Sequence, residues 1–495
     1  MSPRVTFIVG KINQRPGTFA RAEDGTVLVL WAMFLAVALG FLALSFDLGR
    51  VASTQSELQS YADQVALAAA GELDGRPDSI TRATAAASGL VRDSQTYAQG
   101  ANLLAGSGNY ILTFLSTLPT DDRAAATATT TNAALARYVR VQVLDRSVVT
   151  GFAGANAALT GRPGTNAQVN VAAVATAGMT SWACDITPLM FCLPNTSWRA
   201  TNNIGQQLLL RSGGGNSWFP GNFGFMDVTA IATDPTGPCA GASGANLYEC
   251  LVGAERGITQ CIRTDTFTLQ TQPGQRNGLA QAFNMRFDNY QGNSNRLSGN
   301  ASYRPAANTV QGTRVGGSGC RSNNPPTSNA LTLPRDSNID PTLQNPIRFG
   351  NRTYSWANYI NTNHGGSFPA GTSATSTRYQ MYLAEIAAAR SRTAPNNVPL
   401  PGRNETGAPS CSRAGASPDL ERRTVIAAAI DCSTLGTGGG RTTVTPLEYV
   451  RIFLTEPVGV QGNEANIWGE VVGTAGGVGS GATTGAFNDF VQLYR

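Results

Sequence analysis

Residues 26–46 read TVLVLWAMFLAVALGFLALSF, and this stretch decides the architecture of the chain. It contains no charged side chain. At about 1.5 Å per residue, a helix of this length spans about 31 Å, which is the thickness of the hydrocarbon core of a bilayer. Buried core helices of soluble proteins usually have shorter apolar runs. We therefore predict a transmembrane helix over residues 26–46.

The charges before this stretch predict its orientation. Residues 1–25 carry four basic and two acidic side chains, and the positive-inside bias places such a flank in the cytoplasm. The expected arrangement is a single-pass inner-membrane protein with residues 47–495 in the periplasm. A cleavable secretory signal is the alternative, but its apolar region would span only about 7–15 residues. The longer run favours an uncleaved anchor.

Composition excludes several classes of function. Of 495 residues only 14% are charged and the net charge is +5, which argues against a dedicated nucleic-acid binder. Lys11 is the sole lysine, so a phosphate-binding loop ending in Gly-Lys-Ser/Thr is excluded. His364 is the sole histidine, which excludes zinc sites with several imidazole ligands. We expect no catalytic residues, no metal and no cofactor, and we predict that the protein is not an enzyme.

All cysteines follow the predicted membrane segment. An even number of cysteines in an exported region favours disulfides, and neither C-x-x-C nor a Cys/His ligand spacing is present. The spacing leaves the connectivity open. The candidate disulfide cysteines are Cys184, Cys192, Cys239, Cys250, Cys261, Cys320, Cys411 and Cys432.

Helical periodicity continues beyond the membrane segment. Val51, Leu58, Tyr61 and Val65 share one stripe, with polar residues on the other faces. A helix leaving the membrane must bury such a stripe on its own head or on a partner, so these four residues are a candidate interaction face. The sequence DGRP at residues 74–77 ends this helix.

Two regions with different composition follow. Segments 111–118, 138–149 and 167–179 are rich in β-branched residues and partly alternate, which predicts a small sheet against the preceding helices. After residue 182 the chain becomes rich in Gly, Asn, Ser, Thr and Pro, and the cysteines begin. Helical patterns in this second region cover residues 278–290 and 378–391, and predicted core strands cover residues 424–430, 447–458 and 465–473.

These patterns predict an α+β fold. One transmembrane helix continues into an extended helix, a small α/β head follows, and a larger β-rich, disulfide-containing periplasmic region completes the chain. The expected units are a cytoplasmic flank, the membrane helix, the helix with its small sheet, and the cysteine-containing region, at residues 1–25, 26–46, 47–181 and 182–495.

Isolated acidic residues and the histidine give weak signals of chemistry. His364 lies in the polar sequence NTNHGGS, which is typical of a solvent-exposed loop. Glu456 and Glu470 could form an acid pair on neighbouring strands, although solvent-facing strand positions explain them as well. The alternation from Asp336 to Asp340 lacks the Gly and Glu of an EF-hand and indicates a turn. Asp431 begins a D-x-S sequence that we interpret as a strand end.

Three stretches together resemble a known family. FARAEDGTVLVL, LSFDLGRV and LQSYADQVALAAA, at residues 19–30, 44–51 and 58–70, resemble the N-terminal region of TadE/TadG-like proteins of the Tad (tight adherence, Flp-type) pilus system. Those proteins carry a basic flank, an acidic-Gly step, one membrane helix, Asp-x-Gly-Arg and a Leu-Gln/Ala-rich helix. Ala22 and Leu30 occupy the positions where processed prepilins carry Glu, so the resemblance does not extend to prepilin-type cleavage.

The resemblance extends to a longer, TadG-like type and implies a pilin-like head. Similar segments include PGNFGFMD and RRTVIAAAIDC at residues 220–227 and 422–432. The implied function is a structural or assembly component of a Tad/Flp-type pilus, acting in adhesion or surface attachment. The implied partners are the inner membrane and other Tad pilus-assembly proteins, with homo- or hetero-oligomers formed through the N-terminal helix. The alternative is a membrane-anchored periplasmic ligand-binding protein or hydrolase with its site in the C-terminal half.

Overall fold

The computed structural model describes most of the chain. The residues outside the description are 1–24, 75, 120, 122–123, 134, 155–167, 184–185, 213–217, 229–232, 256–261, 264–268, 273–278, 280, 310–311, 316–318, 323–331, 344, 401–408, 436–440, 462–463, 477–486 and 495. Residues 1–24 of the predicted cytoplasmic flank, Cys184 and Cys261 therefore lie outside the described residues.

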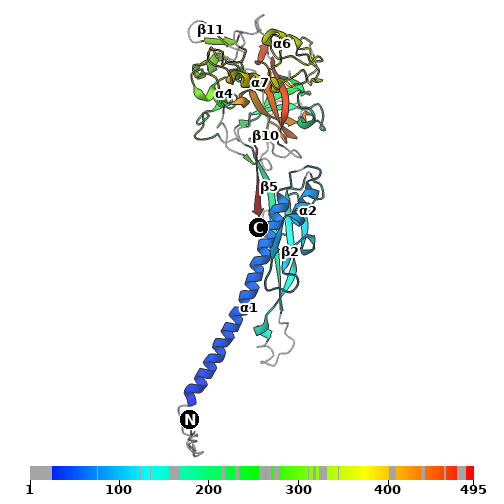
Figure 1. Cartoon of the computed structure of the whole chain (residues 1–495), viewed down its shortest axis with the longest axis vertical. Helices are drawn as coiled ribbons and strands as arrows, with labels where there is room; N and C mark the ends of the chain where they lie inside the picture. The colour runs from blue at the N-terminus through cyan, green and yellow to red at the C-terminus, as the bar shows by residue number, and fades with distance from the viewer. Residues whose placement is uncertain are drawn as a thin grey trace, which may run out of the picture.

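A single helix, α1 (Gly25–Ala70), forms the lower part of the molecule in Figure 1. Its 46 residues contain no proline, and at about 1.5 Å per residue they extend for roughly 69 Å. Among the described residues, α1 is the one helix that is long and apolar enough to cross a membrane. Its first half projects away from the remainder of the chain, and large apolar side chains such as Leu28 and Phe34 are exposed. The prediction of one apolar helix that continues into an extended helix is confirmed.

The second half of α1 packs on a small antiparallel sheet. The sheet has the order β18-β5-β4-β3, and α2 (Ser79–Gly89) packs beside α1. Alternate residues of β4 and β5, among them Val141 and Ala175, face the helices and form one apolar core with them. The bounds are β3 (Tyr110–Leu115), β4 (Tyr138–Val149), β5 (Gln168–Ala183) and β18 (Phe487–Tyr494).

The last strand of the chain was not predicted from sequence. β18 pairs with β5 from Thr176 to Ala183, so the C-terminal end of the chain returns to the sheet beside α1. We therefore propose that the helix-and-sheet unit, which the sequence bounds at residues 47–181, also includes β18. The short strands β1 (Arg92–Ser94) and β2 (Leu103–Ala105) form a separate hairpin, and β9 (Ile262–Arg263) extends the sheet at the end of β5.

The larger C-terminal region, called the head from here on, contains a mixed sheet that closes on itself. Its order is β15-β13-β6-β8-β7-β17-β16, and an additional pairing of β15 with β17 joins the two sides into a ring. Alternate side chains of the ring strands, such as Phe191, Leu208 and Ile452, form the largest core cluster. The bounds are β6 (Leu189–Cys192), β7 (Gln207–Ser212), β8 (Asn222–Phe225), β13 (Thr424–Ile430), β15 (Glu448–Leu454), β16 (Gly459–Gln461) and β17 (Glu464–Gly476).

Helices and small hairpins surround this ring. The predicted helix over residues 378–391 is present as α7 (Arg378–Arg390), and its N-terminus has a capping box between Thr377 and Gln380. The predicted helix over residues 278–290 is instead the 3-10 helix η5 (Gln281–Phe287), where the Asn284 side chain bonds both backbone groups of Val458. The remaining described α-helices and strands are α4 (Gly244–Gly253), α6 (Ala357–His364), β10 (Leu269–Gln270), β11 (Gly312–Val315), β12 (Gly319–Ser322) and β14 (Thr443–Val444).

Three disulfides lie within the described part of the head. Cys192–Cys432 joins the ends of the parallel neighbours β6 and β13, with 5.3 Å between the Cα atoms. Cys239–Cys250 fastens a loop to α4, and Cys320–Cys411 joins β12 to a distant loop. The first of these closes a segment of 240 residues, which strongly restricts the unfolded chain.

Candidate functional site

The predicted interaction face of α1 is covered by the protein's own sheet. Leu58, Tyr61 and Val65 are fully buried, and Val51 packs against the same core at its edge. Their neighbours are the apolar residues of β4 and β5 described above. The sequence left open whether the stripe is buried on the protein itself or on a partner, and in the structure it is buried on the protein's own small sheet.

Polar residues of α1 reach the edge of the sheet. β18 pairs with β5 only from Thr176 onward, so no strand among the described residues pairs with the preceding part of β5 on that side. Gln55 and Gln59 donate their side-chain amides to the carbonyls of Ala172 and Val174, each at 3.0 Å. The helix thereby satisfies a strand edge that could otherwise pair with another chain.

The Asp-x-Gly-Arg sequence lies where α1 meets the lower end of the sheet. The carboxylate of Asp47 is buried, and its Oδ2 accepts a hydrogen bond of 2.8 Å from the backbone N–H of Ala153. Phe46 contacts Phe152, with 6.2 Å between ring centroids. These contacts fix the helix to the residues after β4 immediately beyond the predicted membrane segment.

Arg50 lies one turn above Asp47 on α1. Its guanidinium stacks over Tyr97, 5.5 Å from the ring centroid. The loop carrying Tyr97 is held on the helix by Glu57, which accepts hydrogen bonds from the N–H and Oγ1 of Thr96 at 2.9 and 2.7 Å. The five positions from Phe46 to Arg50 therefore connect α1 to two separate loops of the small sheet unit.

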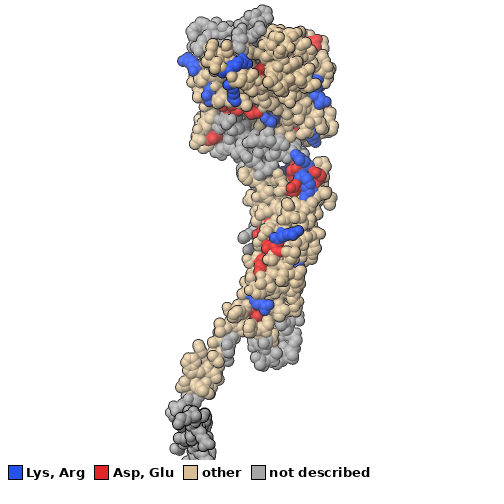
Figure 2. All heavy atoms as spheres, viewed as in Figure 1, with Lys and Arg blue, Asp and Glu red and all other residues tan. Residues whose placement is uncertain are grey.

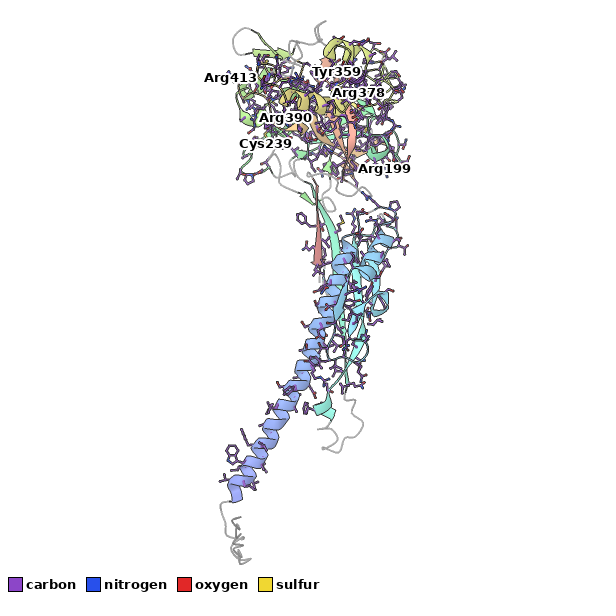
Figure 3. The ribbon with its side chains drawn as sticks, in the orientation of Figure 1. Arg199, Cys239, Tyr359, Arg378, Arg390 and Arg413 are labelled. Atoms are coloured by element: carbon purple, nitrogen blue, oxygen red, sulfur yellow. A yellow bond between two sulfur atoms is a disulfide. The ribbon has the colours of Figure 1, made fainter. Side chains whose placement is uncertain are left out.

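A buried ion-pair network lies at the start of α7 in the head. Arg378 is fully buried and pairs with Asp336 at 2.5 Å and with Glu470 at 2.9 Å. It also donates to the carbonyl of Pro334, and its guanidinium stacks on Tyr354 at 3.8 Å. Burial raises the pKa of Glu470, and the adjacent Arg378 guanidinium opposes this effect. The network joins α7 to β17 and to the loop before α6. Arg378 is labelled in Figure 3.

Two further buried arginines bind the C-terminal end of α4. Arg286 donates to the carbonyl of Val252, and Arg422 donates to those of Gly253 and Ala254. The last carbonyls of a helix lack intrahelical partners, so cations at this end are favourable. Burial lowers the pKa of Arg422 to about 10. These side chains stabilise a loop-rich interior.

Arg423 has a similar role between η5 and α7. Its guanidinium donates to the carbonyls of Leu454 and Thr455 and lies 4.5 to 5.2 Å from the ring centroids of three aromatic residues, Phe287, Tyr382 and Phe453. Sequence analysis missed all of these buried arginines. The double arginine before β13 is the one local signal, and it resembles an ordinary surface pair.

The prediction that His364 lies in a solvent-exposed loop is wrong. His364 is the last residue of α6, and its Nε2 lies 2.7 Å from Oε1 of Glu385 on α7. Tyr359 donates a 2.5 Å hydrogen bond to the same oxygen, and Asn308 bonds the other one. The Glu385 side chain is 1% exposed. Tyr359 and His364 lie on α6, Asn308 lies in a separate loop, and the acceptor Glu385 lies on α7, so only the tertiary structure brings these three segments together into a buried polar contact.

The candidate acidic residues do not converge. Glu456 pairs with Arg335 at 2.7 Å, whereas Glu470 belongs to the network of Arg378, so the solvent-facing prediction is wrong for Glu470. Asp336 was predicted to lie in a turn. Its side chain is instead buried in the same network, where its carboxylate balances the charge of Arg378.

Asp340 and Asp431 accept hydrogen bonds from the backbone two residues later, which is typical of Asx turns. Across the described residues, no group of three or more His, Cys, Asp and Glu side chains is arranged to hold a metal ion.

Burial also raises the pKa of one further carboxyl group in the head. Glu448 on β15 is fully buried and accepts a hydrogen bond from the N–H of Ala200 at 2.9 Å. Desolvation raises its pKa, and the Ala200 bond opposes this effect. This bond connects the first residue of β15 to the segment before β7. No second acidic side chain contacts Glu448 among the interactions of the described residues.

Comparison with known families identifies the region around α1. Residues 25–72 match the family model described as Putative Flp pilus-assembly TadE/G-like. The matched range begins at the first residue of α1 and ends just beyond its last, so it contains the apolar segment, Asp-x-Gly-Arg and the packed stripe. The predicted TadE/TadG-like resemblance is confirmed for residues 25–72. No curated protein and no solved structure matches the chain.

Proposed function

We propose that the chain is a structural or assembly component of a Tad/Flp-type pilus, anchored in the inner membrane by α1 with its head in the periplasm. The observation that carries this proposal is the division of α1 into two halves. The first half exposes apolar side chains on every face, and the second half is part of the core of a sheet. The family match covers both halves.

This arrangement suits a protein that holds a folded head at a fixed height above a bilayer. In Figure 2, the described lower part of α1 carries no charged side chain on the visible face, whereas charged residues occur over the sheet unit and the head. The head is held to the sheet unit by β5 and β18, which are two antiparallel strands of the same sheet. The small sheet packed on one helix is the pilin-like part, and the larger head makes specific contacts in adhesion or assembly.

The proposed orientation predicts the outcome of reporter fusions. Alkaline phosphatase folds only in the oxidising periplasm. A fusion after residue 75 is expected to be active, and a fusion after residue 25 is expected to be inactive. Equal expression of the two fusions is the control. Activity at residue 25 combined with inactivity at residue 75 would refute the orientation.

The proposed role predicts partners in the native membrane. Full-length protein carrying an affinity tag, extracted in mild detergent, is expected to retain other Tad pilus-assembly proteins, identified by mass spectrometry. An unrelated single-pass membrane protein with the same tag is the matched control. Retention of no Tad protein, together with turnover or retention of a small ligand, would support the alternative of a membrane-anchored periplasmic ligand-binding protein or hydrolase.

A further inference from the structure

A surface pocket lies at the end of the predicted membrane segment. It has a volume of 320 Å³ and lies between α1 and the loop that carries Tyr97. Small-ligand pockets have volumes of about 300–1,000 Å³, so this one is large enough for a small polar group. Its lining residues are Ser45, Phe46, Gly49, Arg50, Ser53 and Tyr97.

The pocket presents a cation whose neighbouring acids are bound elsewhere. Arg50 forms no ion pair with another described residue. The closest acids along α1 are Asp47, which accepts the N–H of Ala153, and Glu57, which accepts both donors of Thr96. A guanidinium accompanied by the hydroxyls of nearby serines is a combination that suits an anion with several oxygens, above all phosphate.

The height of the pocket corresponds to the headgroup layer of a membrane. Arg50 follows the last residue of the predicted span by four positions, or about 6 Å along the helix. The headgroup region adds about 5–8 Å on each side of the hydrocarbon core. Phe46 lines the pocket and contacts Phe152, so the two rings form an apolar rim beside it. Both rings are exposed, Phe46 to 65% and Phe152 to 52%. Exposed aromatic rings are typical of a membrane interface.

We propose that this pocket binds the phosphate of an anionic phospholipid, supplied by the membrane that holds α1. The inference rests on the membrane anchoring in the proposed function and adds a ligand to it. Arg50 pairs with the phosphate, Ser53, one turn further along α1, donates a hydrogen bond to it, and Phe46 and Phe152 lie in the interface around it. The bound lipid fixes the depth and the rotation of α1, and therefore the direction in which the head points.

Lipid titration of the full-length protein tests this site. The delipidated protein in detergent is titrated with dihexanoyl-phosphatidylglycerol, and binding is followed by native mass spectrometry. Arg50→Gln is expected to weaken binding at least tenfold, which corresponds to about 1.4 kcal/mol. Arg50→Lys, which keeps the charge but not the planar fork, is expected to lose less.

Arg92→Gln is the matched control. Arg92 is exposed, and its replacement removes the same charge as replacement of the half-buried Arg50. Its neighbour Asp93 accepts a hydrogen bond from Gln64 of α1, which lies about 21 Å further from the membrane than Arg50. Arg92→Gln is expected to bind as wild type does. Equal losses in Arg50→Gln and Arg92→Gln would overturn the proposal, because they would show attraction to net charge alone. If Arg50→Gln fails to fold, Ser53→Ala tests the same pocket, and unchanged lipid binding in that variant would also overturn the proposal.

Two further titrations identify the source of the bound phosphate. Dihexanoyl-phosphatidylcholine, whose choline group offsets the phosphate charge, is expected to bind more weakly. Inorganic phosphate that displaces the lipid at equal concentration would assign the pocket to an anion from solution and overturn the lipid assignment. Alkaline carbonate extraction of native membranes separates the two proposals. Loss of the wild-type protein from the membrane pellet would contradict anchoring, whereas retention without specific lipid binding would contradict only the lipid site.

Discussion

Arg378→Met is expected to lower the free energy of unfolding of the head by about 3–5 kcal/mol. The substitution leaves two buried carboxylates, Asp336 and Glu470, without their shared cation. Burial already raises the pKa of Glu470, so loss of the guanidinium raises it further and favours uptake of a proton. Denaturant unfolding of the full-length protein in detergent, followed by tryptophan fluorescence, measures the change.

Arg390→Met is the matched control because Arg390 is exposed at the opposite end of α7 (Figure 3) and, among the described residues, donates to the carbonyl of Pro418 alone. It is expected to change the unfolding free energy by less than about 1 kcal/mol. The triple variant Arg378→Met, Asp336→Asn and Glu470→Gln is expected to recover part of the loss, because no unbalanced charge remains. Equal stability of Arg378→Met and Arg390→Met would contradict the importance of the network.

Leu58→Asp and Val65→Asp are each expected to destabilise the helix-and-sheet unit by about 4 kcal/mol. Both side chains are fully buried in the apolar core, so a carboxylate at either position would be buried without a cation. Limited proteolysis of the full-length protein and co-purification of Tad proteins provide the two readouts. Because the stripe packs on the protein's own sheet, both protease resistance and co-purification are expected to fall.

Ser56→Asp introduces the same charge on the exposed side of α1 and is the control. It is expected to behave as wild type in both assays. A loss of co-purification in Leu58→Asp or Val65→Asp with unchanged protease resistance would mean that the stripe faces a partner, in disagreement with the structure. Identical behaviour of all three variants would refute the amphipathic interpretation of the helix.

The sequence by itself determined the elements whose patterns are long or regular. An uninterrupted apolar run of bilayer length predicts one exposed helix whatever the fold of the rest of the chain, and the first half of α1 is such a helix. The alternation within residues 138–149 predicts β4 with the observed bounds. The apolar segments that became β13, β15 and β17 were also predicted, because strands buried on both faces are rich in β-branched and apolar residues.

Only the tertiary structure decided which segments meet. The alternation of apolar and polar residues in a strand indicates that one face is buried, but it does not specify which strand lies beside it. The pairing of β18 with β5 and of β15 with β17 could therefore not be predicted from the sequence of these strands. An arginine in a polar sequence is normally solvated, because burial without partners is costly. Arg378 is buried because Asp336 and Glu470, distant in sequence, supply its counter-charges there. His364 likewise meets Glu385 only after α6 and α7 have packed.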